Sequence, residues 1–138
     1  MTTDEKVFYL DTSIWLDIYE GAEDNGKSAR EMVERIVKRG WIIVYSDAVV
    51  QELKRVGIME RDIDELLRIA VPWHLARCYV TRSLLARARQ ISMQRGIPKF
   101  DVLHALVARD NEAVLVLRDN HFSRLRDIVV TKLPEEII

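Results

Sequence analysis

Short runs of apolar residues recur along the chain, and none of them alternates polar with apolar positions. Four of these runs lie at residues 7–10, 41–45, 113–117 and 128–130. Unbroken apolar runs of this length are typical of strands buried on both faces, which favours a parallel sheet between layers of helices. A fifth candidate strand, at residues 79–80, is too short for the pattern to predict it with any force.

The segments between these runs show the three- and four-residue apolar spacing of helices. The spacing predicts helices around residues 29–37, 59–70, 84–91 and 100–107. Gly40, Pro72 and Gly96 stand where the first three should end, and Pro98 stands near the start of the fourth. Further helices are expected after the first two strands, and residues 20–26 are expected to form a surface loop.

Strands that alternate with helices predict an α/β fold with mostly right-handed crossover connections. Residues 1–138 are expected to form one domain, long enough to bury a core, because the chain shows neither a repeat nor a linker. Hydrophobic residues make up 49% and charged residues 31%, which is an ordinary globular composition.

The net charge of −1 means that a polyanion would have to be held by a local basic patch or through a metal ion. The single cysteine, Cys78, excludes an internal disulfide and a multi-cysteine zinc site, and it suits a reducing cytosol. No apolar run approaches the ~20 residues of a membrane span, and the polar residues 1–5 do not resemble a signal peptide. The expected protein is cytoplasmic and makes no use of a membrane.

Acidic residues follow the predicted strands at the edge where ligands of open α/β sheets usually bind. Asp11 follows the first strand directly, Asp47 lies two residues past the second, and Asp119 lies two residues past the third. Acids are 22 of the 138 residues, and loops favour aspartate, so any one of these can equally be a cap or a solvated charge.

Helical geometry separates the acids after the second strand. Ser46 is a natural N-cap, and Asp47 falls in the first turn, pointing away from the apolar face, which suggests a structural acid. Glu52 lies roughly 60° from the centre of the apolar face, at 100° per residue. A carboxylate on that flank is poorly solvated and needs a partner, such as a cation.

A later helix repeats the arrangement. Asp101, His104, Ala105 and Ala108 share one side of it, and the two alanines allow a close approach to the sheet that would bring Asp101 near the strand ends. The alternative is an acid favoured only by the helix dipole.

Taken in order, four segments resemble the signature segments of the PIN domain family, in the branch of small prokaryotic proteins typified by VapC toxins. They are Leu10-Asp11-Thr12-Ser13, Ser46 through Glu52-Leu53, Phe100-Asp101 through His104-Ala105, and Arg118-Asp119-Asn120-His121-Phe122. The resemblance implies a three-layer α/β/α fold with a central, mostly parallel sheet of four or five strands. It also implies a metal-dependent endoribonuclease whose matching acids are Asp11, Glu52, Asp101 and Asp119.

The same resemblance implies an auxiliary hydroxyl at Thr12 or Ser13, products with 5′-phosphate and 3′-hydroxyl ends, a homodimer, and a VapB-like antitoxin as partner. One position departs from the family, which usually has Thr or Ser two residues before the last acid, where this chain has Leu117. The missing hydroxyl would weaken a second metal position or leave a water in its place.

Four neighbouring carboxylates repel one another, and a hard cation such as Mg²⁺ or Mn²⁺ removes that conflict. Such an ion also relieves charge on a scissile phosphate and activates water. Asp11 and Asp119 are expected to be direct ligands, and Asp101 a ligand of a second ion or of the first ion's water. Glu52 would bind the metal or orient the attacking water as a base.

The histidines, His74, His104 and His121, form no zinc motif. His104 can contact a substrate phosphate, donate to a carboxylate or serve as a buried structural group, and His121 is expected to shape a turn. Residues 82–99 carry a local charge of +5, from Arg82, Arg87, Arg89, Arg95 and Lys99. They would line an RNA path or form a solvated helix face. Asp17 is expected to be solvated or outside the direct ligands.

Three other functions compete with a toxin ribonuclease. An RNA-processing nuclease without an antitoxin would use the same chemistry. A PIN-like binding module without activity is favoured only by Leu117. A phosphoryl-transfer enzyme of the haloacid-dehalogenase type would need a second Asp two residues after Asp11, where this chain has Ser13.

Overall fold

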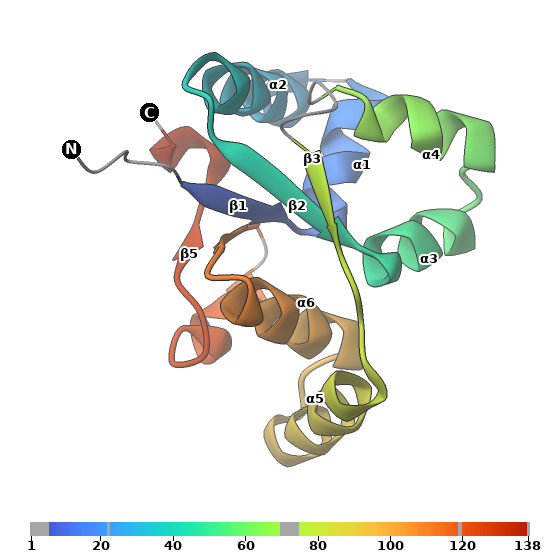
Figure 1. Cartoon of the computed structure of the whole chain (residues 1–138), viewed down its shortest axis with the longest axis vertical. Coiled ribbons are helices and arrows are strands. Elements are labelled where there is room, and N and C mark those ends of the chain that lie inside the picture. The colour runs from blue at the N-terminus through green and yellow to red at the C-terminus, as the bar shows by residue number, and fades with distance from the viewer. Residues whose placement is uncertain (1–5, 22, 70–74, 119, 138) are drawn as a thin grey trace.

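The fold is seen in a computed structural model, which describes residues 6–21, 23–69, 75–118 and 120–137 (Figure 1). The described strands are β1 (Val7–Leu10), β2 (Ile42–Ser46), β3 (Leu75–Cys78), β4 (Val114–Val116) and β5 (Thr131–Lys132). The described helices are α1 (Thr12–Glu20), α2 (Glu23–Lys38), α3 (Asp47–Arg55), α4 (Glu60–Leu67), α5 (Arg82–Arg95) and α6 (Lys99–Asp110), with the 3₁₀ helices η2 (Asn120–Leu125) and η3 (Pro134–Glu136).

The strands form one sheet in the order β3-β2-β1-β4-β5, and every described pair is parallel. The first strand in the chain is therefore the central one. Helices α1, α2 and α4 cover one face, and α6, with α5 outside it, covers the other (Figure 1). This arrangement confirms the predicted three-layer α/β/α fold. It also confirms that the unbroken apolar runs are strands between two layers, since Tyr9, Leu10, Ile43 and Leu115 are fully buried.

The predicted strand at residues 128–130 is wrong, and β5 begins at Thr131, directly after that segment. The backbone N–H groups of Ile128 and Val129 still donate to the carbonyl of Leu125 (2.9 and 3.2 Å), so they belong to the turn after η2. Val129 is nevertheless buried. The apolar run therefore reflects the contact of Val129 with the core, and only the carbonyl of Val130, which accepts the N–H of Leu115 in β4 (2.9 Å), joins the sheet.

The candidate strand at residues 79–80 also lies beyond the true one. β3 is an edge strand that contacts only β2 in the described sheet, and its Ala76 and Arg77 are exposed. Because an edge strand is not enclosed by neighbours on both sides, it does not need the unbroken apolar run that predicted the others. Tyr79, just past the strand, is exposed.

Residues 20–26 are not the predicted surface loop, because α2 already begins at Glu23. Gly21 ends α1 with a positive φ of 61° and donates its N–H to the carbonyl of Asp17 (2.9 Å). Gly26 lies inside α2, where a Cβ atom would come within 2.9 Å of the Asp17 carbonyl oxygen. The two glycines thus permit a sharp corner and a close crossing of α1 and α2, rather than a flexible loop.

The other helices lie where the apolar spacing predicts them, although α4 ends at Leu67, and Pro72, which was expected to end it, lies outside the described residues. α5 ends at Gly96, whose φ of 65° is left-handed and whose N–H donates to Ser92, and α6 starts directly after Pro98. None of the helices in the described ranges is both long enough and apolar enough to cross a lipid bilayer.

Candidate active site

Asp11 joins the central strand to the first helix. Its N–H donates to the carbonyl of Val116 (2.9 Å), which extends the β1–β4 ladder by one bond. Its Oδ2 accepts hydrogen bonds from the N–H (3.3 Å) and the hydroxyl (2.6 Å) of Ser13, so Asp11 is the N-cap of α1. Its Oδ1 lies 3.9 Å from Nε2 of His104. A buried carboxylate is thus fixed at the positive end of a helix dipole.

Glu52, on α3, approaches the same histidine nitrogen, Nε2 of His104, that Asp11 approaches. The hydroxyl of Thr12 donates to its Oε1 (2.7 Å), and Nε2 of His104 lies 2.5 Å from the same oxygen. Burial raises the pKa of Glu52, but the bonds from His104 and Thr12 outweigh it, so the pKa is lower than usual. As its position beside the apolar face of α3 predicts, this carboxylate has hydrogen-bond partners, which among the described residues are His104 and Thr12.

His104 is fully buried and is bonded on both ring nitrogens. Its Nδ1 lies 2.6 Å from the hydroxyl of Tyr9, and that hydroxyl lies 2.7 Å from Oγ of Ser46. Ser46 occupies the N-cap position of α3, as predicted, but its side chain makes no capping bond. The hydroxyl points to Tyr9 instead, so β1, β2, α3 and α6 are joined through one chain of polar groups.

Asp101 lies in the first turn of α6, half-buried and one turn before His104, as its spacing predicts. The edge of the Phe100 ring faces His104, with the centroids 6.4 Å apart. Asp119 lies outside the described residues, as does His74, so the place of Asp119 in the site stays a prediction. Within residues 6–21, 23–69, 75–118 and 120–137, no three Asp, Glu, His or Cys side chains lie close enough to hold a metal ion together.

The oxygen donors that the structure brings together fit a hard cation. In the described part of the chain, Oδ1 of Asp11 accepts no hydrogen bond, and both bonds to Glu52 go to Oε1. A carboxylate oxygen that accepts no hydrogen bond has its lone pairs available, and such an oxygen is a suitable ligand for Mg²⁺ or Mn²⁺. Two such groups alone do not complete a coordination sphere.

The family model of the PIN domain matches residues 8–128. This chain belongs to the PIN domain family. The match runs from the second residue of the central strand β1 to the turn before β5, so it leaves out only β5 and η3 among the described elements.

Solved structures similar to this PIN domain show the same fold over nearly its whole length. VapBC2 from Rickettsia felis, bound to a DNA fragment from its promoter, is 20% identical, with 92% of this chain and 98% of that chain covered and a TM-score of 0.67. VapC20 from Mycobacterium tuberculosis, a toxin that cleaves the sarcin–ricin loop, is 19% identical, with coverages of 87% and 95% and a TM-score of 0.65. FitAcB from Neisseria gonorrhoeae is 16% identical, with coverages of 92% and 97% and a TM-score of 0.57. A search of curated protein sequences gave no match.

Two other acids of the PIN domain have structural partners. Asp47 forms an exposed ion pair with Arg77, which agrees with its prediction as a structural acid. Asp17 contacts Arg118 (3.5 Å), which also contacts Glu135 (2.7 Å). Burial raises the pKa of Asp17, and Arg118 opposes that shift. Arg118, directly before Asp119 in the sequence, is thereby held to α1 and to the 3₁₀ helix η3.

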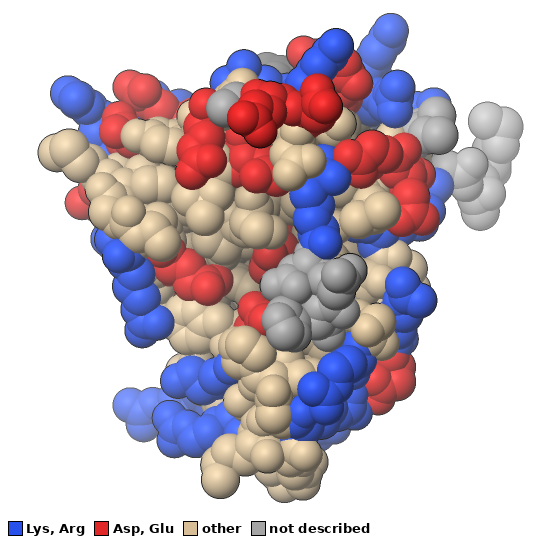
Figure 2. Space-filling model, turned by 180° about the vertical axis from the view of Figure 1, so that it is seen from behind, with Lys and Arg blue, Asp and Glu red and all other residues tan. Residues whose placement is uncertain are grey.

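The predicted basic residues divide into two groups. Arg82, Arg87 and Arg89 are exposed on α5. Arg95 instead donates to both carboxylate oxygens of Asp127 (2.9 and 2.8 Å), and the ammonium of Lys99 lies 5.7 Å from the Phe100 ring centroid. Figure 2 shows acidic side chains mostly in the upper half of one face, with a few near its middle, and basic ones gathered at the lower end, where α5 lies, as well as along the top. Whether these cations bind RNA stays a prediction.

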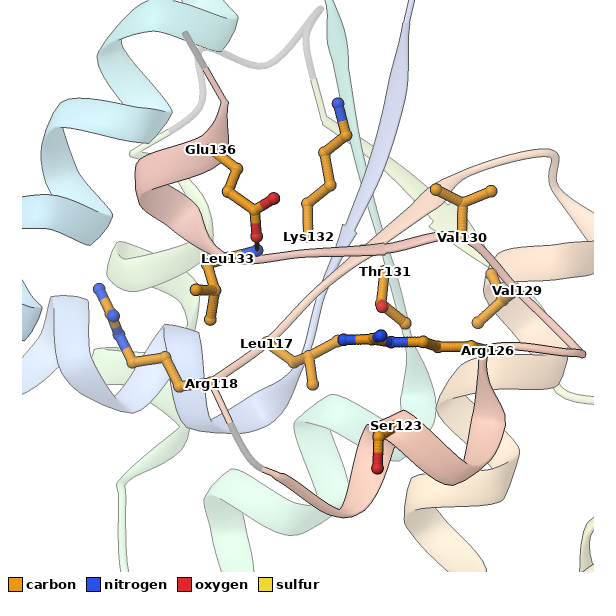
Figure 3. A pocket seen from close by; sticks show the side chains of 10 residues that line it. All are labelled: Leu117, Arg118, Ser123, Arg126, Val129, Val130, Thr131, Lys132, Leu133 and Glu136. Carbon is orange, nitrogen blue, oxygen red and sulfur yellow. Dashed lines mark hydrogen bonds between the residues drawn. The ribbon is translucent and has the colours of Figure 1, made fainter.

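A cavity of about 750 Å³ surrounds the edge strand β5 (Figure 3). Arg126 reaches along one side of the strand toward Leu117, and Val130 and Lys132 leave the strand on the other side (Figure 3). The one carboxylate in the lining, that of Glu136, accepts the N–H of Leu133 (3.0 Å). Arg126 and Lys132 form no ion pair within the described ranges. Val116 and Lys132 face each other in the β4–β5 register, so the cavity lies two strands from Asp11.

Sequence reasoning missed Tyr9 altogether, and it missed the bond that Ser46 makes to Tyr9 instead of a capping bond. A tyrosine inside a strand of otherwise apolar, buried residues was the available signal, because a buried phenol requires a hydrogen-bond partner. The sequence gives no means of choosing that partner, since Ser46 and His104 lie 37 and 95 positions away.

Proposed function

We propose that this PIN domain is a Mg²⁺- or Mn²⁺-dependent endoribonuclease and the toxin of a toxin–antitoxin pair. The main support is the convergence of Asp11 and Glu52 on one buried histidine at the carboxyl ends of the central strands. The similar fold of VapC20, a toxin that cleaves the sarcin–ricin loop, favours RNA as the substrate. The similar fold of VapBC2, which binds DNA of its own promoter, favours a VapB-like antitoxin as the partner.

In this mechanism Asp11 and Asp119 would bind the ion directly, Glu52 would bind it or orient the attacking water, and Asp101 would bind a second ion or one of the first ion's waters. A bound Mg²⁺ or Mn²⁺ would relieve charge on the scissile phosphate and make water a stronger nucleophile. Ser13 fixes the carboxylate of Asp11 through two bonds, so little reorganisation is required when a ligand arrives. Glu52, kept ionised at neutral pH by its lowered pKa, binds the ion or orients the attacking water.

The test is cleavage of a panel of structured RNAs by the purified chain, with Mn²⁺ titrated and EDTA added afterwards. We expect cleavage that requires the ion, and we expect Asp11→Asn to abolish it. Asparagine is as good an N-cap as aspartate, so this substitution should leave the melting temperature nearly unchanged. The matched control is Asp64→Asn, which removes an exposed acid from α4. Full cleavage by Asp11→Asn would remove Asp11 from the mechanism.

The partner is tested separately from the chemistry. We expect a homodimer in solution, measured by light scattering, and a short antitoxin-like reading frame directly upstream of this gene. We expect the chain to arrest growth when it is expressed alone and not when the upstream product is made with it. Metal-dependent cleavage without any growth arrest would favour an RNA-processing nuclease that has no antitoxin.

A binding module without activity is the second candidate, and one observation favours it. Leu117, where the family usually carries a hydroxyl, is buried and lines the cavity beside β5. Cleavage of RNA in Mn²⁺ that stops with EDTA would exclude this candidate, whereas RNA binding without cleavage at any metal concentration would support it.

A further inference from the structure

A chain of hydrogen bonds between buried side chains lies behind the candidate site, and its donors and acceptors can be assigned. It runs from Ser46 Oγ to the Tyr9 hydroxyl (2.7 Å), to Nδ1 of His104 (2.6 Å), and from Nε2 to Oε1 of Glu52 (2.5 Å). Tyr9, Ser46 and His104 are each fully buried, so water does not complete their bonds. Each link therefore needs one proton from one of its two ends.

One assignment satisfies every link with a neutral ring. Ser46 donates to the Tyr9 oxygen, Tyr9 donates to Nδ1, and the proton on Nε2 is donated to Glu52. Tyr9 is fully buried and its oxygen contacts the Ser46 hydroxyl and Nδ1, so its O–H can serve as this donor. Glu52, an acceptor only, also receives the hydroxyl of Thr12.

The reverse assignment is worse. If Tyr9 donated to Ser46, then Nδ1 would have to donate to Tyr9, and both ring nitrogens would carry protons. The Ser46 hydroxyl would then have no acceptor among its described neighbours, although the residue is fully buried. A buried hydroxyl without an acceptor and a buried cationic ring both cost free energy.

We propose that Tyr9 is a positioning residue: its hydroxyl donates to Nδ1 and fixes the orientation of the His104 ring, and Nε2–H in turn holds Glu52 in the orientation that RNA cleavage requires. The first half of this proposal concerns the ring alone. The second half rests on the proposed function, because it gives Glu52 a role in cleavage.

This role differs from simple packing. Without the Tyr9 hydroxyl, Nδ1 loses its donor, while the Glu52 carboxylate still keeps the proton on Nε2. The ring is then held at one nitrogen instead of two, so the ring and the carboxylate can turn away together from the orientation that Tyr9 and Ser46 impose. Groups that orient a metal-binding side chain typically change affinity or activity about 10- to 100-fold when they are removed.

The first experiment reads the ring directly in the metal-free protein. Nitrogen-15 NMR of labelled histidine distinguishes a protonated ring nitrogen from an unprotonated one, and loss of a signal in His104→Gln assigns it. We expect the proton on Nε2 in both proteins, and we expect the signal of the unprotonated Nδ1 to shift in Tyr9→Phe, because that nitrogen no longer accepts a hydrogen bond. The matched control is Tyr45→Phe, which removes a phenol from the neighbouring strand without touching His104.

The second experiment measures cleavage. Tyr9→Phe should lower the rate constant about 10- to 100-fold with KM unchanged, because a fully buried residue cannot contact RNA. Tyr45→Phe should behave like the unaltered chain. In a His104→Gln background, where an amide N–H replaces Nε2–H, Tyr9→Phe should have no further effect. If Tyr9→Phe does not fold, His104→Gln should still cleave faster than His104→Asn, whose shorter amide cannot reach Glu52.

Several results would overturn the proposal. They are a His104 ring protonated on Nδ1 or on both nitrogens in the unaltered chain, an unchanged Nδ1 signal in Tyr9→Phe, and unchanged cleavage by that variant. So would equal cleavage by His104→Gln and His104→Asn. A chain that cleaves no RNA under any condition would instead refute the proposed function, and the NMR result on the ring would stand.

Discussion

The two halves of the sheet's carboxyl edge are built in opposite ways. At the ends of β1 and β2, polar side chains are buried and bonded to one another, from Ser46 through Tyr9 and His104 to Glu52. At the ends of β4 and β5, the strands are short and surround a cavity in which Arg126 and Lys132 have no ionic partner within the described ranges. We call these the closed half and the open half.

The closed half and the open half are suited to different tasks in the proposed RNA cleavage. A closed network holds side chains in fixed positions, as metal binding and water activation require. An open cavity lined by cations can bind a polyanion reversibly, through electrostatic attraction to its phosphates. Asp11 lies at the boundary, because its N–H is bonded to Val116 of β4 while its carboxylate faces His104.

The largest effect should come from the closed half, with Glu52→Gln. The amide removes the charge that the His104 and Thr12 bonds support, so we expect cleavage to fall about 100-fold. A second measurement follows from the lowered pKa of Glu52. At a pH above the usual pKa of a glutamate, the ionised carboxylate stabilises the fold, and this contribution is lost as the pH falls through the lowered pKa of the folded protein. In EDTA, the melting temperatures of the two proteins should therefore differ at neutral pH and converge in acid. A constant difference across that range would contradict the assignment.

An intermediate effect is expected at the boundary, with Leu117→Thr. This change restores the hydroxyl that the family usually has, but it removes a buried apolar side chain and should lower the free energy of unfolding by about 2–3 kcal/mol. Urea unfolding measures the loss. Val130→Thr, at an exposed position in the lining of the same cavity, is the control and should cost much less. Equal costs would show that the open half extends to Leu117.

The smallest effect should come from the open half, with Arg126→Ala. If RNA passes over the cavity, this change weakens RNA binding by the Asp11→Asn protein and lowers the slope of log affinity against log salt by about one. Arg61→Ala, an exposed cation on α4, should leave both quantities unchanged. An unchanged slope in Arg126→Ala would place the RNA elsewhere, and the exposed arginines of α5 would be the next to test.

Sequence reasoning reached further in the closed half than in the open half. Asp11 and Glu52 were selected from strand ends and helical angles, and the structure places both beside His104. The open half was read less well, because residues 128–130 look like a strand and form a turn. Burial alone produces an apolar run, whereas a strand also requires backbone N–H groups that are free to bond to a neighbouring strand. The N–H groups of Ile128 and Val129 are not free, because they donate to the carbonyl of Leu125.

The amino-acid sequence by itself determined the alternation of strands and helices, the three layers and the acids at the strand ends, because these depend on local periodicity and on residue type. Only the tertiary structure decided that Tyr9 and Ser46 complete a hydrogen-bond chain to His104, and that glycines at 21 and 26 make a corner instead of a loop. The physical reason is that a buried polar group must be satisfied by whatever partner the folded chain brings within about 3 Å, and that partner leaves no mark in the surrounding sequence.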